Sequence, residues 1–320
     1  MKTVLVTGAS GYLGKHLIHA LARDRKGIKE IIAADIIEPS PETREKGITY
    51  LKADVRSLEI NRIIKAHSVD TIVHLATIVT PPKGSSRDLT YSVDVIGTQN
   101  ILNACIENHV KKIIVTSSGA AYGYYADNAP LLTEDDPIRG NREFAYSYHK
   151  RLVEEMLAEY RAQYPQLKQI VFRPGTILGE NVSNQITNLF EKKIVLGIKG
   201  ADSPFVFIWD QDLINVLVQG VRESAVGQFN VAGDGCLEMQ EISGIVGLPV
   251  VSPPVWLVKA LLAIARPLRL TRFGPEQVRF IQYRPVLSNE RLKSVFGYSP
   301  QKSSREVLEY FVKTRAEGNG

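Results

Sequence analysis

Cysteine is scarce in this chain of 320 residues, which has only Cys105 and Cys236, far apart in the sequence. Two isolated cysteines provide neither a disulfide framework nor a cluster of metal ligands. We therefore expect a protein of the reducing cytoplasm with no metal site.

Long apolar runs are also missing, since none reaches the roughly 18 residues that a membrane span requires. The nearest candidate, residues 255–270, is interrupted by Lys259, Arg266 and Pro267. For this segment the sequence leaves three interpretations open: an apolar lid over a substrate, a helix at a membrane interface, or packing inside a small domain. The first residues, MKTVLVTGAS, run directly into a strand-like pattern, so we expect no removable signal peptide.

A basic stripe is absent too. The net charge is +5, but lysine and arginine alternate with acidic residues along the chain, which argues against nucleic-acid binding. With 44% hydrophobic residues the chain can bury a full core, as one elaborated domain or two modest ones.

What the sequence does contain, in its first half, is a regular alternation of strand-like and helical patterns. Six short runs rich in β-branched residues are separated by helical periodicity, which is typical of βαβ units. These predicted strands are residues 2–7, 30–35, 48–53, 71–76, 112–117 and 169–174. The pattern predicts an α/β protein with a doubly wound parallel sheet.

A glycine-rich turn follows the first predicted strand and carries Gly8, Gly11 and Gly14. Without side chains there, the backbone can approach a pyrophosphate at the N-terminus of the next helix. Asp35 ends the second strand about 20 residues later, where a carboxylate can accept a hydrogen bond from a ribose 2′-hydroxyl. Because a carboxylate repels a 2′-phosphate and the next residue is Ile36 rather than an arginine, we expect a Rossmann domain that binds NAD, not NADP.

Other cofactor contacts are expected where the strands end. Asp54 could accept a hydrogen bond from the adenine amino group, or could simply cap a helix. Leu75, Ala76 and Thr77 follow the fourth strand, where the dinucleotide should cross the sheet. The predicted cofactor-binding residues are Gly8, Ser10, Gly11, Tyr12, Leu13, Gly14, Asp35, Ile36, Asp54, Val55, Leu75, Ala76, Thr77, Thr116, Tyr146, Lys150, Pro174, Gly175 and Thr176.

Regular alternation breaks after Pro174. Residues 175–185 and 198–204 are predicted loops, and FVFIWD (205–210), a helix and QFNVAG (228–233) are expected to return a strand-helix-strand unit to the sheet. We expect an NAD-binding domain of residues 1–174 and 206–234. A smaller C-terminal substrate-binding cap would comprise residues 175–205 and 235–320.

Three side chains are candidates for proton transfer. Tyr146 and Lys150 are four positions apart in a helical pattern, so they share one face, and an ammonium near a phenol lowers the phenol pKa from about 10. Ser118 follows the fifth strand and could orient a substrate oxygen. Taken alone, the pair is more often a solvated helix face, and a serine at a strand end is more often part of a turn.

Several motifs occur together and in order along nearly the whole chain. They are TGASGYLG (7–14), Asp35, ADV (53–55), HLA (74–76), SSGAAYG (117–123), YSYHK (146–150), RPG (173–175) and NVAGDG (230–235). Together they resemble the extended short-chain dehydrogenase/reductase superfamily, and within it the NAD-dependent epimerase/dehydratase family.

The resemblance implies a role for each matching residue. Tyr146 would be the acid/base, Lys150 would orient the nicotinamide ribose and lower the Tyr146 pKa, and Ser118 would position the substrate. Residues 174–176 would lie near the carboxamide. It also implies a homodimer formed by the helices near residues 97–109 and 146–163.

Departures from the family pattern narrow the expected activity. Gly119 and Ala120 replace the Asp-Glu pair of nucleotide-sugar 4,6-dehydratases, which argues against dehydration. Ser203 and Pro204 stand where an arginine often binds a diphosphate, and Asp94 replaces a family asparagine. Arg284 is a doubtful match to a second family arginine.

The expected function is reversible hydride transfer at a secondary alcohol, with NAD and a small alcohol, ketone or sugar as substrate. One alternative is a UDP-hexose 4-epimerase. Another is a non-catalytic NAD-sensing protein, which would not need Tyr146, Lys150 and Ser118.

Overall fold

The computed structural model describes residues 1–80, 87–182, 186–187, 194–201, 204–268, 270–271 and 274–318. The chain divides into two compact units. Unit 1 comprises residues 1–118, 149–173 and 211–229, and unit 2 comprises residues 119–148, 174–210 and 230–320.

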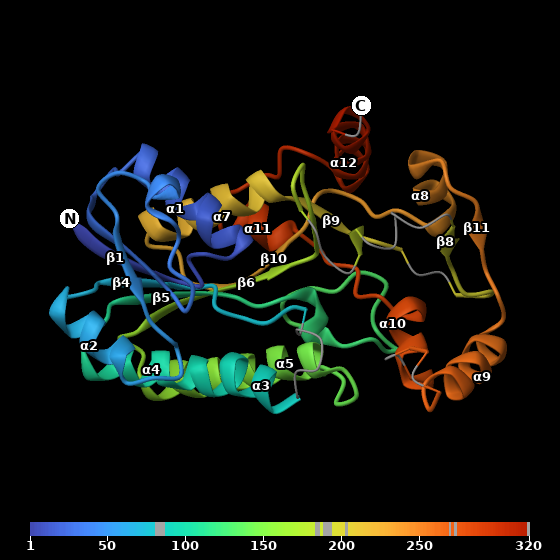
Figure 1. Cartoon of the computed structure of the whole chain (residues 1–320), viewed down its shortest axis with the longest axis horizontal. Helices are drawn as coiled ribbons and strands as arrows, with labels where there is room; N and C mark the ends of the chain where they lie inside the picture. The colour runs from blue at the N-terminus through green and yellow to red at the C-terminus, as the bar shows by residue number, and fades with distance from the viewer. Residues whose placement is uncertain are drawn as a thin grey trace. The chain divides into compact units, whose positions relative to one another are not determined.

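Unit 1 is built on a seven-stranded sheet in the order β10-β6-β5-β4-β1-β2-β3 (Figure 1). The strands are β1 (Lys2–Thr7), β2 (Ile28–Asp35), β3 (Thr49–Lys52), β4 (Thr71–His74), β5 (Lys112–Thr116), β6 (Lys168–Pro174) and β10 (Gly227–Val231). Strands β3 and β2, β2 and β1, β1 and β4, β4 and β5, and β5 and β6 each pair in parallel. Strand order reverses between β1 and β4, which is where open sheets of this kind bind ligands.

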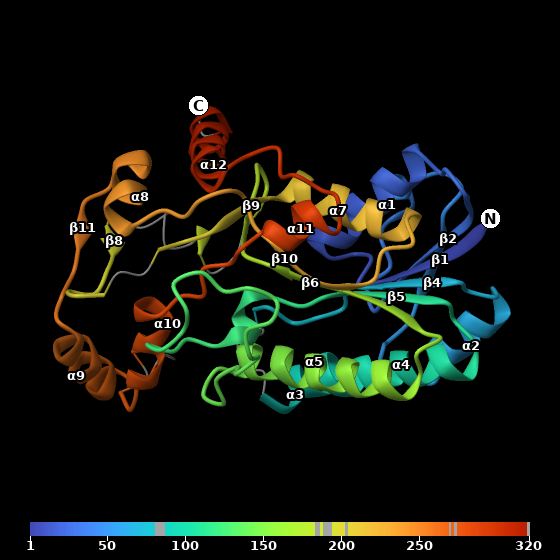
Figure 2. The same cartoon turned by 180° about the vertical axis from the view of Figure 1, so that it is seen from behind.

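Helices cover both faces of this sheet, as both views show (Figures 1 and 2). On one face lie α1 (Tyr12–Arg23) and α7 (Asp210–Arg222), and on the other lie α2 (Glu59–Ala66), α4 (Gly97–Glu107) and α5 (Ala145–Gln163). The second face packs a continuous apolar core that includes Leu5, Ile64, Leu102 and Leu157, each fully buried. Burial on both faces explains why the strand sequences are continuous apolar runs.

The doubly wound α/β fold is therefore confirmed, and the six predicted strands each match a strand of the sheet to within two residues at either end. One prediction is wrong. FVFIWD contains β9 (Phe207–Trp209), which pairs with β7 (Thr176–Leu178) in a separate two-stranded sheet, while only QFNVAG, as β10, joins the main sheet. Pro174 has no N–H to continue a ladder, so the chain leaves β6 there and begins β7 in a predicted loop.

Unit 2 contains two small sheets and several short helices. Besides β7 and β9 it has β8 (Val195–Leu196) paired with β11 (Val250–Val251). Its helices are α8 (Met239–Val246), α9 (Val255–Ala265), α10 (Val278–Gln282), α11 (Glu290–Ser294) and α12 (Ser304–Gly318), with the 3₁₀ turn η4 (Pro275–Gln277). Its largest core gathers Leu178, Phe207, Ile242 and Leu308 from β7, β9, α8 and α12.

Helix α9 covers most of the apolar segment whose role the sequence left open. The structure describes all of its residues, and none of them is buried. The helix therefore does not lie in the interior of unit 2, although it packs on the surface of that unit against η4 and α10. Within the described residues, no helix is long and apolar enough to cross a membrane.

Candidate active site and dinucleotide cradle

The glycine turn between β1 and α1 leaves no room for side chains. Gly8 has φ of +71°, and a Cβ there would lie 2.6 Å from the Ala76 backbone nitrogen. A Cβ on Gly14 would lie 2.2 Å from the Gly8 carbonyl oxygen. Gly11 precedes α1, and neither a side-chain cap from the described residues nor an acidic residue in the first turn occupies this helix end. The turn therefore fits an anion such as a pyrophosphate at the positive end of a helix.

Asp35 lies beside this turn at the end of β2, and its carboxylate is fixed by two backbone N–H groups. Oδ2 accepts from the Ser10 amide at 3.0 Å and Oδ1 accepts from the Ile37 amide at 2.9 Å. Ionised carboxylate oxygens keep further lone pairs, so a ribose diol can still donate to them. Ile36 and Ile37 are exposed and offer no positive charge for a 2′-phosphate.

Asp54 follows β3 but does not cap α2, whose N-cap is Leu58. Its carboxylate accepts instead from the Arg56 amide at 2.9 Å and from the Arg56 guanidinium. The hydrogen bond from Arg56 is the main reason why the pKa of Asp54 is lowered. Its predicted contact with adenine stays a prediction. Neighbouring Val55 is buried, and a Cβ on Gly97 would meet it at 2.6 Å.

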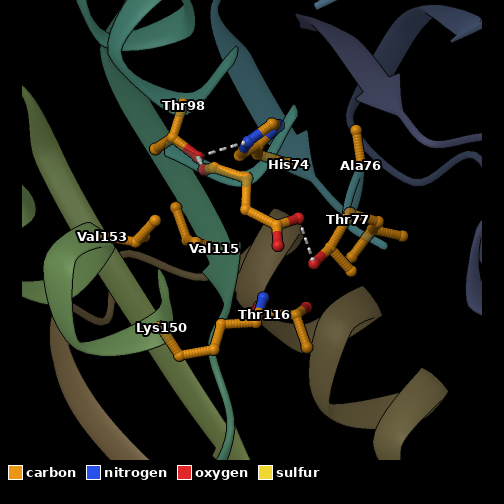
Figure 3. A pocket seen from close by; sticks show the side chains of 10 residues that line it. His74, Ala76, Thr77, Thr98, Val115, Thr116, Lys150 and Val153 are labelled. Atoms are coloured by element: carbon orange, nitrogen blue, oxygen red, sulfur yellow. Dashed lines mark hydrogen bonds between the residues drawn. The ribbon is translucent and has the colours of Figure 1, made fainter. Parts of the chain in front are cut away.

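A small pocket opens at the carboxyl ends of β4 and β5 (Figure 3). It is lined by His74, Leu75, Ala76, Thr77, Asp94, Thr98, Val115, Thr116, Lys150 and Val153. The pocket therefore brings together five predicted residues, Leu75, Ala76, Thr77, Thr116 and Lys150, beside the strand β4 that borders the reversal of strand order. His74, Asp94 and Thr98 join them without having been predicted as site residues.

Lys150 reaches this pocket from α5. Its Nζ donates to the Thr116 carbonyl oxygen at 2.9 Å, and the residue is only 5% exposed. Burial lowers the Lys150 pKa, while the nearby carboxylates of Asp94 and Glu154 partly oppose that shift. The Thr116 hydroxyl, also buried, has no hydrogen-bond partner among the described residues. Buried hydroxyl groups ordinarily form a hydrogen bond, so this hydroxyl at the pocket wall is available to bind a ligand.

Asp94 lies on a π-helical turn, Ser92–Ile96, between α3 (Arg87–Tyr91) and α4. Oδ1 accepts from the Thr77 hydroxyl at 2.8 Å and from the Ile78 amide at 3.0 Å, and Oδ2 lies 3.2 Å from His149 Nδ1. Burial raises the Asp94 pKa, but these hydrogen bonds and the Lys150 charge outweigh burial and leave it lowered. The residue that departs from the family pattern is thus an ionised carboxylate beside Lys150.

His74 closes a buried chain of hydrogen bonds behind the pocket. Thr98 Oγ1 donates its proton to the Asp94 carbonyl oxygen at 2.6 Å, so it must accept from His74 Nε2 at 3.0 Å. His74 Nδ1 then accepts from the Thr7 hydroxyl at 2.7 Å. Burial lowers the His74 pKa to about 3, so this ring is neutral at physiological pH. Its position at the end of β4, in HLA, was the signal that could have identified it.

Tyr146 lies half-buried in the first turn of α5, one turn before Lys150. Ser118 follows β5. Its neighbour Ser117 has a structural role, because the Ser117 hydroxyl donates a hydrogen bond to the Glu154 carboxylate at 2.6 Å. Glu154 also pairs with buried Arg173 at 2.6 Å. The predicted meeting of Tyr146 with Ser118 stays a prediction.

Residues 174–176 lie where β6 gives way to β7. The Gly175 amide donates to the Val231 carbonyl at 2.9 Å, and the Thr176 amide donates to the Val206 carbonyl at 3.1 Å. A Cβ on Gly175 would lie 3.1 Å from the Val206 carbonyl oxygen, a tight contact. Ser203, singled out by the sequence, lies outside the described residues. Arg284 is buried against the rings of Phe205 and Phe280, at 3.7 and 4.6 Å from their centres.

The sheet, the glycine cradle and the fixed carboxylate of Asp35 define a Rossmann protein that binds a dinucleotide. The chain belongs to the NAD-dependent epimerase/dehydratase family, whose model matches residues 4–211. NAD is the cofactor of this family, and the predicted cofactor is confirmed.

Known proteins resemble the chain over half of its length or more. An uncharacterised protein of Mycobacterium tuberculosis is 26% identical over 98% of this chain and 84% of its own. UDP-glucose 4-epimerase of Azospirillum brasilense is 28% identical over 55% of this chain and 49% of its own. The structure of UDP-glucose 4-epimerase from Thermotoga maritima, with UDP-glucose, superimposes with a TM-score of 0.74 at 19% identity, covering 99% of this chain and all of that one.

Proposed function

We propose that the protein is an NAD-dependent oxidoreductase or epimerase that transfers a hydride reversibly at a secondary alcohol, with Tyr146 as acid/base. The observation that carries this proposal is the placement of Lys150. Its buried ammonium lines the pocket at the carboxyl ends of β4 and β5, one helical turn from Tyr146. A buried lysine with a lowered pKa in a pocket is a candidate functional group.

Each residue of the trio has a distinct task. The Tyr146 phenolate takes the proton of the substrate hydroxyl as the carbinol hydrogen leaves as hydride, so alcohol becomes ketone, and the same phenol returns the proton in reverse. The Lys150 ammonium stabilises that phenolate. Ser118 donates a hydrogen bond that orients the substrate oxygen. NAD, when bound, supplies the acceptor for the hydride.

The cofactor would be held mainly by groups that the structure already fixes. We propose that the amides after Gly8 bind the pyrophosphate, Asp35 binds the adenosine ribose, and Lys150 with Thr116 lies nearest the nicotinamide ribose. The same proposal includes the remaining predicted cofactor contacts, which are Ser10, Tyr12, Leu13, Ile36, Asp54, Val55, Leu75, Ala76, Thr77, Pro174, Gly175 and Thr176. It also includes the domain division and the homodimer through α4 and α5.

A UDP-hexose 4-epimerase is the second candidate, favoured by the resemblance to UDP-glucose 4-epimerase of Azospirillum brasilense. Epimerisation would use the same first half-reaction and return the hydride to the other face of the ketone. Dehydration is a weaker candidate, because Gly119 and Ala120, in a short 3₁₀ turn after β5, carry no acid or base.

The test combines a substrate panel with one substitution. Net NADH formation with secondary alcohols would support a dehydrogenase, and interconversion of UDP-hexoses without net NADH would support the epimerase. Tyr146→Phe should abolish turnover, by about 10³-fold or more, and retain NAD binding. Tyr148→Phe, on the same helix, is the matched control and should keep turnover.

Equal turnover of Tyr146→Phe and wild type would overturn the assigned mechanism. NAD binding by the wild type with no turnover of any alcohol, ketone or UDP-sugar would favour the sensing protein instead.

A further inference from the structure

Helix α9 exposes apolar side chains where a surface helix ordinarily carries polar ones. Trp256, Leu261 and Ile264 are 69%, 58% and 62% exposed. Trp256, Ala260 and Ile264 are four positions apart, so they form one stripe along the helix, and all three are exposed. We call the exposed face of Trp256, Ala260, Leu261 and Ile264 the α9 stripe.

The opposite face of α9 is apolar as well. Val258, Leu262 and Ala265 are half-buried on that side, and the helix contacts η4 and α10. One apolar face is thus enough to attach α9 to its unit. The α9 stripe is a second apolar face, and exposed apolar surface continues past the helix to Leu268 and Leu270, which are 63% and 77% exposed.

The sequence around this helix carries an excess of basic residues. Between Glu241 and Glu276 the sequence has no acidic residue, while it has Lys259, Arg266, Arg269 and Arg272. Lys259 is exposed and lies one position before Ala260, at the edge of the α9 stripe. Arg266 forms an ion pair with Glu276 at 3.0 Å, and Lys259 lines an open hollow together with Glu143, Glu276 and Arg279.

The size of the stripe argues against a second protein as its occupant. A helix of eleven residues is about 16 Å long and about 10 Å wide, so its outer face falls far short of the roughly 800 Å² per partner that a stable dimer buries. A bilayer interface requires only a narrow apolar strip with basic residues beside it. Tryptophan and lysine also suit that interface, because each has an apolar body and a polar tip.

We propose that the α9 stripe binds the surface of an anionic lipid bilayer, so that the protein is a peripheral membrane protein. Trp256 and Ile264 enter the boundary between headgroups and acyl chains. Lys259 extends its ammonium to the lipid phosphates. Each basic side chain near an anionic surface contributes about fivefold to the partition coefficient, which makes the interaction depend on lipid charge and on salt.

Co-sedimentation with lipid vesicles tests the proposal directly. The full-length protein should sediment with vesicles that contain phosphatidylglycerol and phosphatidylcholine, and much less with phosphatidylcholine alone. Raising the salt concentration should weaken the association. The double substitution Trp256→Ser and Ile264→Ser should lower the partition coefficient by about tenfold or more.

Val295→Ser provides the matched control, because Val295 is 67% exposed in the same unit, away from α9 in the sequence. It should sediment like the wild type. Failure of the wild type to bind either kind of vesicle would overturn the proposal, as would equal binding by the double variant. Loss of self-association in the double variant, measured by analytical ultracentrifugation without any loss of vesicle binding, would assign the stripe to a second copy and also overturn it.

Discussion

Two regions of this protein depart from the usual placement of polar side chains at the surface and apolar side chains in the interior. One region buries polar groups, and the other exposes apolar ones. Beside the pocket of unit 1, the polar side chains of Asp94, His149 and Lys150 are buried, at 3%, 1% and 5% exposure. On α9 of unit 2, Trp256 and Ile264 are mostly exposed. Both placements cost stability, so each indicates a use that folding alone does not require.

The two regions differ in which contacts offset the unfavourable free energy of this placement. Each buried charge of the pocket faces a partner: Asp94 faces His149, and Lys150 faces the Thr116 carbonyl. Buried charges are tolerated only with such partners. The α9 stripe has no comparable compensation inside its unit. The cost of burying the polar groups is therefore offset by contacts within the chain. The cost of exposing the α9 stripe can be offset only by contact with another molecule.

The largest effect is expected from removing the charge at Lys150. Lys150→Met should lower kcat/KM by about 10³-fold, because no ammonium would then stabilise the Tyr146 phenolate. Steady-state kinetics on the substrate found by the panel measures this effect. Lys112→Met is the matched control: Lys112 is also buried, and it donates to the Gly220 carbonyl at 2.8 Å, but it begins β5 while Thr116 ends it. If both variants lose activity equally, the pocket has no special role.

A smaller effect, on stability, is expected at Asp94. Asp94→Asn should cost about 2 kcal/mol of unfolding free energy at pH 7, because charge-assisted hydrogen bonds to Thr77, Ile78 and His149 are lost or weakened. Urea denaturation monitored by circular dichroism provides the measurement. Asp54→Asn, which disrupts a largely exposed pair with Arg56, should cost under about 1 kcal/mol.

The pH dependence of that difference follows from the direction of the Asp94 shift. The folded-state pKa lies below the ordinary value of 3.8, so the contribution of Asp94 is fully present above that value and is lost as the pH falls through the lower folded-state pKa. His149 and Lys150 face the carboxylate, and His74 lies behind them with a pKa of about 3. The stability gap between wild type and Asp94→Asn should therefore close below pH 3.8; a gap that widens there would contradict an ionised Asp94.

The smallest effect is expected where apolar groups are exposed. Trp256→Ser and Ile264→Ser should each change the unfolding free energy in solution by less than about 0.5 kcal/mol, because these side chains bury little area. Leu102→Ala, at a fully buried apolar position in α4, should cost about 2 to 5 kcal/mol. Thermal and urea denaturation compare the two. A loss of more than 2 kcal/mol on α9 would mean that the stripe packs against protein.

Strand prediction succeeded where a local pattern sufficed and failed where pairing partners had to be known. Residues 2–7 and 112–117 show their buried character in their own composition. FVFIWD has the same character, yet β9 pairs with β7 outside the main sheet. No local pattern of FVFIWD contains that information.

The site residues, like the strands, were predictable where a local pattern sufficed and not where distant segments meet. Asp35 and Lys150 belong to motifs with fixed spacing, so their positions followed from the sequence. Asp94 was noticed only as a departure, and its contact with His149 joins residues 55 positions apart. The π-helical turn that carries Asp94 has no sequence signature of the kind that glycine gives to a turn.

The sequence by itself determined the doubly wound sheet, the glycine turn and the one-turn spacing of Tyr146 and Lys150, because strand patterns, backbone freedom and helical periodicity are local properties. Only the tertiary structure decided which polar groups surround Lys150, that β9 leaves the main sheet, and that the apolar segment at α9 is exposed. These depend on which distant segments pack together, and burial, the quantity that gives each side chain its pKa and its energetic cost, exists only after that packing.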